Sequence, residues 1–316
     1  MIDWRASSPA VVARHRAEML ARARAYFTDE QVLSVDTPAL SEFASTDPNI
    51  ESCSVQLATG SRHFLHTSPE FYMKRLLADG YPDIYSICRV FRDGEIGRYH
   101  LPEFTMLEWY RLNFSLGDII SDTTALIAAC IDQPALHEDA IVVGYSTAFQ
   151  DSANVDVFSA TTDELANAVS ADDTLRESIG NDRHAWLDLI LTTVVAPAFI
   201  PNQLTVLQHY PATQAALARI CPADERVADR FEVFHGATEL ANGYVELTNA
   251  DEQRHRFDQD IEKRKFAGQS VSRPDAQLLA ALDNGLPDCA GVAVGLERLQ
   301  MIHVQADDIA KVVTFI

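Results

Sequence analysis

The sequence has 316 residues, of which 47% are hydrophobic and 22% are charged, as is typical of a soluble globular protein. Its 46 acidic residues outweigh 25 basic ones, and the formal net charge of -21 argues against a broad nucleic-acid-binding surface. No apolar run approaches the ~20 residues of a membrane span, and no signal-peptide core is present. The five cysteines are widely spaced without a CxxC pair, which argues against a zinc site or a disulfide framework and favours a cytoplasmic location.

The first elements are expected to be a helix, a strand and a second helix. Ser8 and Pro9 predict an N-cap and a first helical residue, with the helix running to about Phe27. Its basic residues are expected to face water: Arg14, Arg16, Arg22 and Arg24. The stretch VLSVDTPAL (32–40) predicts a strand that Pro38 ends. A helix starting near Ser68-Pro69-Glu70 should bury Met73, Leu76 and Leu77.

The rest of the chain mixes strands and helices without regular βαβ alternation. Strands are expected at 85–92 and 103–111, around the loop 93–102. Residues 115–200 look mostly helical and carry no readable motif. The remaining predicted elements are strands at 205–209 and within 230–247, a charged helix at about 250–266, and a closing strand and helix in CAGVAVGLERLQMI. This grouping predicts an α+β fold with an antiparallel sheet, in a single domain spanning 1–316.

The strand that follows the loop carries an unusual row of side chains. Because side chains alternate along a strand, one face should hold Phe104, Met106, Glu108 and Tyr110. An aromatic ring, a carboxylate and a phenol could stack a base and hold an amine, although a half-buried amphipathic strand would show the same pattern. Arg92, where the first strand ends, could make a bidentate contact with a phosphate, and His100 is a second candidate phosphate contact.

Two further stretches favour a ligand site. If His235-Gly236 form the turn of the hairpin FEVFHGATEL, Glu232 and Glu239 directly oppose each other, and a four-residue turn would still leave both on one face. Opposed carboxylates are unfavourable unless a cation such as Mg²⁺ bridges them or both splay into water. In GVAVGLERL (291–299), small residues leave one strand face bare, so that a ligand could approach the backbone, although small residues also simply permit close packing. Arg298 falls in the first helical turn, where positive charge opposes the helix dipole and favours a partner such as phosphate.

Together these stretches resemble the ordered motifs of class II aminoacyl-tRNA synthetases. Residues 91–111 are similar to motif 2, GVAVGLERL to motif 3, and VLSVDTP to motif 1, whose proline (Pro38) lies at the dimer interface in that family. HTSPEFYMKRLL, EFTMLEWYR and ELANGYVELT resemble the lysyl-specific branch. The resemblance implies a class II catalytic core, an antiparallel sheet flanked by helices, and a homodimer.

The sequence resembles still more closely the truncated paralogues of that branch, which attach (R)-β-lysine to a lysine side chain of elongation factor P. RYHLPEFTMLEWYR, PATQAALA and GVAVGLERL carry this likeness, and Ala293 stands where lysyl synthetases have glycine. The chain starts about where the catalytic core starts, so no anticodon-binding domain and no tRNA anticodon binding are expected. The resemblance implies two steps, with ATP and Mg²⁺: formation of an aminoacyl-adenylate, then transfer to elongation factor P.

The resemblance also implies a role for each matching residue. The ATP-binding set is Arg92, Asp93, His100, Leu101, Phe104, Glu239, Leu240, Gly295 and Arg298, of which Arg92 and Arg298 are also catalytic. The amino-acid-binding set is Ser68, Pro69, Glu70, Glu108, Tyr110, Asn242, Glu246 and Ala293. The metal ligands are Glu232 and Glu239.

Two positions depart from the family pattern. The family usually has an acidic residue two positions after the motif 2 arginine, and this sequence has Gly94 there, followed by Glu95. The family also has an asparagine after the histidine, and this sequence has Leu101. Both lie in the nucleotide loop and put the ATP geometry in question. Two other functions therefore stay open: a core-only lysyl-tRNA synthetase, and a catalytically inactive paralogue that binds an amino acid.

Overall fold

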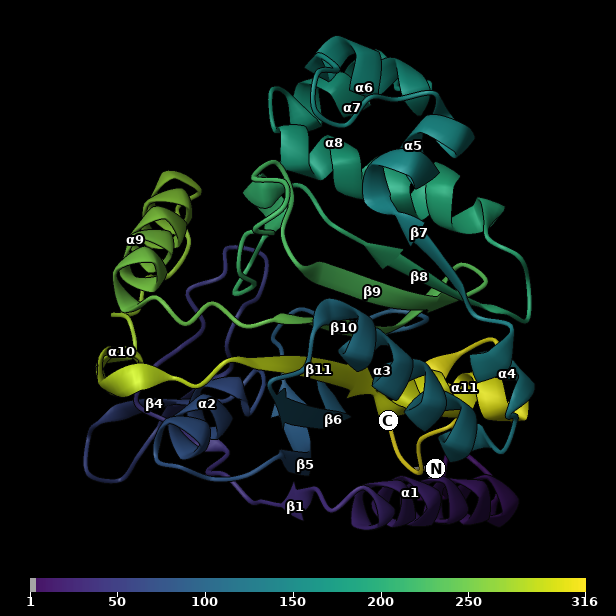
Figure 1. The fold of residues 1–316 in the computed structure, drawn as a ribbon, viewed down its shortest axis with the longest axis vertical. Helices are drawn as coiled ribbons and strands as arrows, with labels where there is room; N and C mark the ends of the chain where they lie inside the picture. Colours follow the sequence, from purple (N-terminus) through teal and green to yellow (C-terminus); the bar gives the residue numbers. More distant parts are fainter. Residues whose placement is uncertain (1–3) are drawn as a thin grey trace. The chain divides into compact units, whose positions relative to one another are not determined.

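The structure is a computed structural model, and it describes residues 4–316 (Figure 1). The chain divides into two compact units. The first unit comprises Met1–Phe114, Ala129–Ile131 and Leu247–Ile316, and the second comprises Ser115–Ala128 and Asp132–Glu246. That residues 1–316 act as one catalytic domain stays a prediction.

The first unit is built on a sheet whose strand order is β1-β5-β6-β11. These strands are β1 (Leu33–Ser34), β5 (Ile84–Phe91), β6 (Glu103–Leu112) and β11 (Cys289–Gly295). β1 pairs parallel to β5, whereas β5, β6 and β11 pair antiparallel. A small antiparallel sheet follows the order β2 (Leu40–Ser41), β4 (Arg62–Leu65) and β3 (Ser54–Gln56). The strands at 85–92 and 103–111 are thus confirmed, whereas the strand predicted over 32–40 is wrong in extent.

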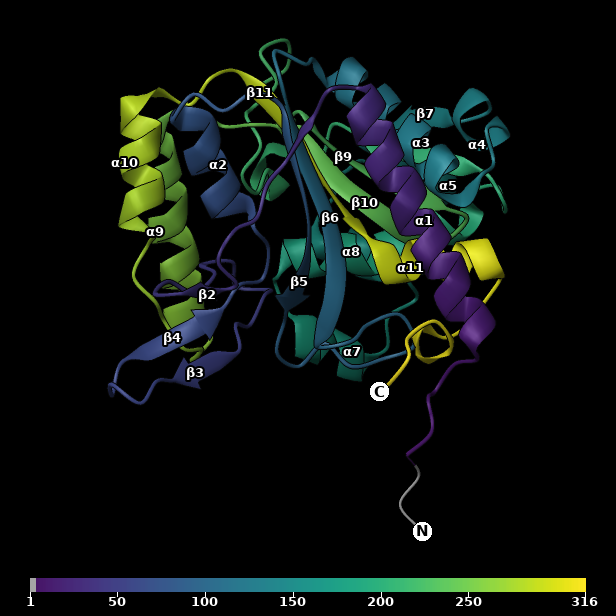
Figure 2. The same cartoon turned by 90° about the horizontal axis from the view of Figure 1, so that it is seen from below.

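Helices flank this sheet. They are α1 (Ala10–Asp29), α2 (Glu70–Ala78), α9 (Ala250–Phe266), α10 (Ala276–Gly285) and α11 (Leu296–Val304), followed by the 3₁₀ turn η4 (Ile309–Lys311). α1 runs along the strands in Figure 2, and its Phe27 stacks on Tyr85 of β5 at 4.3 Å and meets Trp109 of β6 at 5.6 Å. α1 therefore covers the Tyr85–Trp109 face, and the alternate residues of β5 and β6 point to the opposite face.

Two predictions about the first helix are corrected. Pro9 has extended backbone (φ -72°, ψ 156°), so the helix begins at Ala10 without a side-chain cap. Arg16 and Arg22 do not simply face water. Arg16 donates to Gln300, Thr105 and Glu297, and Arg22 donates to the carbonyl of Cys130 at 2.8 Å. These arginines hold α1 to its neighbours within the first unit.

The second unit carries strands in the order β10-β9-β8-β7. They are β7 (Ile141–Gly144), β8 (Leu204–Gln208), β9 (Arg230–His235) and β10 (Thr238–Val245). β7 and β8 pair parallel, and the other neighbours pair antiparallel. β7 was missed, because its exposed Ile141 and Val142 sit within a helix-rich stretch. Since both units combine mostly antiparallel strands with helices, the α+β prediction is confirmed.

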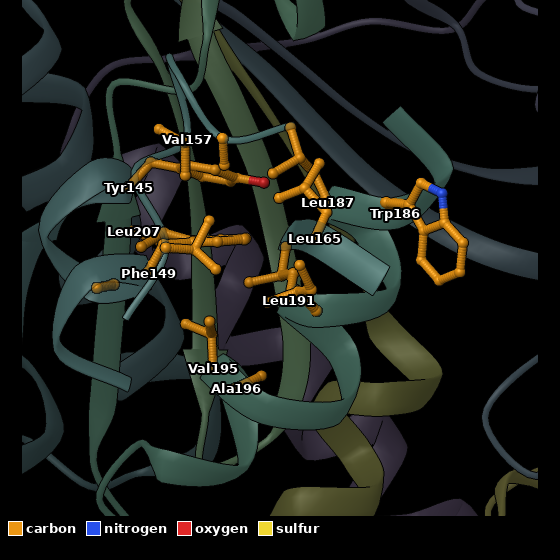
Figure 3. Close-up of a cluster of buried hydrophobic side chains, with 14 of the residues drawn as sticks. Tyr145, Phe149, Val157, Leu165, Trp186, Leu187, Leu191, Val195, Ala196 and Leu207 are labelled. Carbon is orange, nitrogen blue, oxygen red and sulfur yellow. The ribbon is translucent and has the colours of Figure 1, made fainter. Parts of the chain in front are cut away.

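The helices of the second unit explain the Ala- and Leu-rich region 115–200. They are α3 (Leu116–Ile131, whose last three residues group with the first unit), α4 (Ala135–Glu138), α5 (Tyr145–Ala153), α6 (Thr162–Ala168), α7 (Asp173–Ile179), α8 (Arg183–Ile190), and the short turns η1 (Leu191–Val195), η2 (Ala196–Ala198) and η3 (Ala212–Gln214). α5, α6, α8 and β8 enclose the apolar cluster of Figure 3, in which Tyr145 stacks on Phe149 at 4.3 Å. Among the described residues, no helix is both long and apolar enough to span a membrane.

Candidate functional site

The face of the first unit's sheet opposite α1 holds the predicted amine-binding residues, and we call it the Glu108 face. On it, Glu108 of β6 pairs across the sheet with Ser86 of β5 on one side and with Ala293 of β11 on the other. Tyr110 pairs with Gly291, and Met106 with Gly295. The small residues of β11 therefore lie directly beside the carboxylate and the phenol.

Glu108 is a buried carboxylate with an oriented partner. It is 3% exposed, and the hydroxyl of Tyr110 donates a hydrogen bond to its Oε1 over 2.8 Å. Burial, and then the nearby Glu108 charge, raise the pKa of the Cys88 thiol on β5 to about 12. A desolvated carboxylate is costly unless it is paired and hydrogen-bonded, so this face suits a cationic group such as an alkylammonium.

The loop at residues 93–102, which we call the nucleotide loop after its predicted role, follows Arg92. The Arg92 guanidinium lies over the Phe104 ring at 5.2 Å and faces Glu95, with Nη1 and Oε1 3.5 Å apart. Its Nε is buried and makes no hydrogen bond among the described residues. Glu95 thus places a carboxylate beside Arg92, although the family's acidic residue is replaced by Gly94 one position earlier. Gly94 itself has φ +77°, a left-handed conformation that favours glycine.

The loop and the helix after β11 meet through two predicted phosphate contacts. Arg298, in the first turn of α11, places Nη2 2.6 Å from His100 Nε2, and its Nε donates to the Tyr99 carbonyl at 3.2 Å. A Cβ placed on Gly295 would find no heavy atom within 4 Å, so the backbone there is open to a ligand. The Arg298 guanidinium and an open backbone at a helix start form an arrangement that suits an anion.

A residue that sequence reasoning missed fixes this helix to β6. Glu297 is 2% exposed and accepts hydrogen bonds from the Thr105 backbone N–H at 2.9 Å, from the Thr105 hydroxyl at 2.9 Å and from Arg16 at 2.8 Å. These bonds set the position of Arg298 relative to the nucleotide loop. An acidic residue in the first helical turn is ordinary, so nothing at Glu297 alone indicates this role.

The second departure, Leu101, has a packing role. Its side chain packs against the cluster of Met301, Ile309 and Val312. The loop is also tied to the segment after α11, because the Arg98 side chain donates to the Asp307 carbonyl and the Ile309 N–H donates to the Arg98 carbonyl at 2.9 Å. Hydrophobic packing and two backbone contacts hold the loop where the family has a polar asparagine.

The start of α2 holds the Ser68-Pro69-Glu70 segment. Ser68 Oγ accepts from the Glu70 N–H at 3.4 Å, and Lys74, only 2% exposed, donates to Glu70 Oε1 at 2.6 Å. The sequence pointed to Glu70 but not to Lys74, since a lysine one helical turn on is usually a solvated partner. Glu70 is therefore held by a buried cation, and its contact with an amino acid stays a prediction.

In the second unit, the predicted register of the β9–β10 hairpin is wrong. The turn is formed by Gly236 and Ala237, with Gly236 at φ +53°, so Glu239 pairs with Phe234 and Glu232 pairs with Asn242. A bulge at the buried Leu240 shifts the register between the two pairs. The two glutamates are diagonal neighbours on one face and do not directly oppose each other.

Glu232 is not splayed into water either. It is 8% exposed, and Arg230 Nη2 donates to its Oε1 at 2.7 Å. Burial raises the pKa of Glu232 to about 7, Arg230 opposes the shift, and the Glu239 charge adds to it. Arg230 also donates to Asn242 Oδ1 at 3.3 Å. Two neighbouring carboxylates whose charges disfavour each other fit a divalent cation, with Arg230 supplying part of the compensation.

Glu246, beyond Asn242, is also buried at 2% exposure. Its backbone bridges to Ala218. The structure thus groups the predicted residues of the first unit around β5, β6, β11 and α11, and those of the second unit around β9 and β10.

The whole chain, residues 1–316, matches the family described as tRNA synthetases class II (D, K and N). Among similar curated proteins, one from Klebsiella pneumoniae (strain 342) is 41% identical over 319 residues, covering 99% of this chain and 97% of the relative. One from Edwardsiella ictaluri is 40% identical (100% and 98% covered), and one from Haemophilus influenzae (strain ATCC 51907) is 38% identical (99% and 97%). Each is named "Elongation factor P--(R)-beta-lysine ligase". With its ordered motifs, its α+β architecture and this full-length match, the chain belongs to the class II tRNA synthetase family.

Proposed function

We propose that the chain is an ATP-dependent ligase that activates (R)-β-lysine as an adenylate and transfers it to a lysine side chain of elongation factor P. The Glu108 face carries this proposal, because it places a buried carboxylate beside small residues on the same sheet as the nucleotide loop. Relatives of that name, 38–41% identical over almost the whole chain, support the same substrate and acceptor.

In this proposal the Glu108 face binds the distal ammonium of the amino acid. Glu108 supplies the charge, and the Tyr110 hydroxyl, bonded to it at 2.8 Å, fixes its orientation. The assignments of Ser68, Pro69, Glu70, Asn242 and Glu246 to the same substrate remain predictions from the family. A diamine with both ends anchored presents its carboxylate in one orientation, which is most of what an adenylation step requires.

The nucleotide loop and α11 bind ATP. Phe104 stacks on the base, Arg92 contacts the α-phosphate, and His100 with Arg298 contact the distal phosphates. Asp93, Leu101 and Leu240 complete the family's ATP-binding set as predictions. The cations neutralise charge that develops on the phosphate oxygens as the reaction proceeds.

The chemistry has two steps. A carboxylate oxygen of (R)-β-lysine attacks the α-phosphorus of ATP, and the bond to pyrophosphate breaks. The ε-amine of the acceptor lysine then attacks the adenylate carbonyl and releases AMP, with loss of a proton from the amine. Glu239 and Glu232 would hold Mg²⁺, which when bound neutralises charge on the ATP phosphates.

The test is pyrophosphate–ATP exchange by the purified chain with Mg²⁺, comparing (R)-β-lysine with α-lysine, followed by mass spectrometry of elongation factor P. The proposal expects exchange that is faster with (R)-β-lysine and a mass gain of one β-lysyl group. Charging of tRNA with α-lysine would favour a core-only lysyl-tRNA synthetase instead.

One observation favours a second candidate, an inactive amino-acid-binding paralogue. Gly94 and Leu101 replace two polar residues of the family's nucleotide loop, and Leu101 packs into an apolar cluster. Lysine binding without exchange for either isomer, measured by calorimetry, would support that candidate and exclude the ligase.

Assembly and location are part of the proposal. The motif 1 likeness around Pro38 supports a two-fold homodimer, and sedimentation at micromolar concentration tests it. All five cysteines are free thiols, which fits the reducing cytoplasm.

A further inference from the structure

Three side chains with metal-binding chemistry gather in the second unit, and none of them belongs to a set assigned above. His209, Cys221 and Asp229 each offer one ligand atom, and these atoms all lie within 4.8 Å of one another. We propose that they form a binding site for a borderline divalent transition metal, with Zn²⁺ as the expected ion. No pair of them lies in the close spacing that marks a zinc motif in a sequence, which is why the sequence argued against such a site.

The backbone holds all three residues in place. The His209 N–H donates to the Arg230 carbonyl at 2.9 Å, the Cys221 N–H to the Val227 carbonyl at 2.9 Å, and the Asp229 N–H to the Arg219 carbonyl at 3.0 Å. An isolated bridge between Ile220 and Ala228 brings the neighbours of Cys221 and Asp229 together. The backbone at all three ligands is thus fixed by hydrogen bonds, so metal binding would have to order only the side chains.

The carboxylate of Asp229 is already oriented as a metal ligand would be. Its Oδ2 accepts from Arg219 Nε at 2.7 Å, and its Oδ1 faces His209 Nε2 at 3.8 Å. Carboxylates that bind metals are usually hydrogen-bonded to an outer partner as well. Arg219 therefore fits the role of a positioning residue, and Oδ1 is left for the ion.

The separations need only a small closure. Zn–N bonds of about 2.0 Å and Zn–S bonds of about 2.3 Å place tetrahedral ligand atoms roughly 3.5 Å apart. The present separations reach at most 4.8 Å, and His209 and Cys221 are only partly buried. Rotation of these two side chains closes the difference, and their exposure gives an ion access.

The donor set selects the metal. Thiolate and imidazole ligands suit Zn²⁺, whereas Mg²⁺ and Ca²⁺ prefer oxygen ligands. Three protein ligands leave a fourth position for water. The ion would join the end of β8 to the segment before β9, so binding should stabilise the second unit against unfolding.

The experiment titrates Zn²⁺ into the metal-stripped full-length chain in the presence of excess Mg²⁺, using calorimetry. The wild type should bind one Zn²⁺ at a site that Cys221→Ser and His209→Asn each weaken by at least about 100-fold, since loss of an outer partner alone typically costs 10- to 100-fold. Asn is chosen because His209 has φ +60°, a conformation that asparagine tolerates. Asp229 is left intact because it holds Arg219.

Cys53→Ser is the matched control, because Cys53 is another partly buried free cysteine and lies in the first unit. It should bind Zn²⁺ like the wild type. In a second readout, Zn²⁺ should slow alkylation of Cys221 by iodoacetamide at least tenfold and leave the rate at Cys53 unchanged, with sites resolved by mass spectrometry. Zn²⁺ binding that survives both ligand substitutions, absence of binding to the wild type, or unaltered alkylation of Cys221 would each overturn the proposal.

Discussion

Removing the methyl group of Ala293 should relax the discrimination between (R)-β-lysine and α-lysine. Ala293 pairs directly with Glu108 across the antiparallel β6–β11 ladder, on the face that carries the small residues of β11. Side chains paired in this way have Cβ atoms ~4.5–5.5 Å apart. In the proposed binding mode the carboxylate and the distal ammonium of the substrate are both anchored, and the methyl would occupy space that an α-amine needs and a β-amine does not.

The size of the effect follows from the cost of overpacking. Fitting one extra group into a filled site costs ~1–3 kcal/mol, which corresponds to roughly 5- to 150-fold in discrimination. Ala293→Gly should therefore raise kcat/KM for α-lysine in pyrophosphate–ATP exchange by that factor and change the value for (R)-β-lysine much less. The quantity to compare is the ratio of the two kcat/KM values, wild type against variant.

Ala290→Gly is the matched control for this variant. Ala290 lies on the same strand and points to the opposite face, where it is fully buried. Glycine within a strand costs ~0.5–1 kcal/mol of stability at either position, so a ratio that changes in both variants would reflect a loosened strand. A ratio unchanged in Ala293→Gly would refute the steric argument and direct the search to Glu70 and Glu246.

Three further outcomes are expected. Arg298→Lys should raise the KM for ATP, because lysine cannot bridge to His100 and a phosphate as a planar guanidinium can; an unchanged KM in the exchange assay would remove Arg298 from the nucleotide site. Tyr110→Phe takes a donor from the buried Glu108 carboxylate, a loss of ~1.5–3 kcal/mol, so kcat/KM for (R)-β-lysine should fall about 10- to 150-fold, with CD spectra checking that the fold is retained. Burial lowers the pKa of His66 below 6.5, so the unfolded chain binds the proton more readily and His66 reduces the stability of the fold as pH falls below 6.5. The urea midpoint of His66→Gln should therefore depend less on pH between 7.5 and 5.5 than that of the wild type. Equal pH dependence of the two midpoints would contradict this.

Elements with strong periodic patterns were predictable from the sequence. The alternation in EFTMLEWYR gave the strand and the face shared by Glu108 and Tyr110, and the charged helix was placed at Ala250–Phe266, as the structure has it. Arg298 was expected to need a partner because it opposes the helix dipole, and it contacts His100 and Tyr99. Local pattern and local electrostatics were sufficient at these positions.

Register and distant partners were not predictable in the same way. A one-residue change in the position of the turn, together with the bulge at Leu240, moved Glu232 from Glu239 to Asn242. When either of two adjacent residues can occupy the first position of a turn, the sequence does not show which one does. Arg230 and Glu297 act through tertiary contacts, and Lys74 is buried beside Glu70 on its own helix. Each of the three, taken alone in the sequence, looks like an ordinary surface charge.

The tie between Arg98 and the Asp307–Ile309 segment bears on how the protein is made. The two partners are separated by 209 positions in the chain. At a synthesis rate of 5–20 residues per second, the β5–β6 hairpin leaves the ribosome roughly 10–40 s before the residues that hold its loop. A nascent chain therefore carries the strand with Glu108 well before its nucleotide loop can take its final form. Nucleotide added to released chains that end before Asp307 should give no protection of this loop from proteolysis, whereas the full-length chain should gain it.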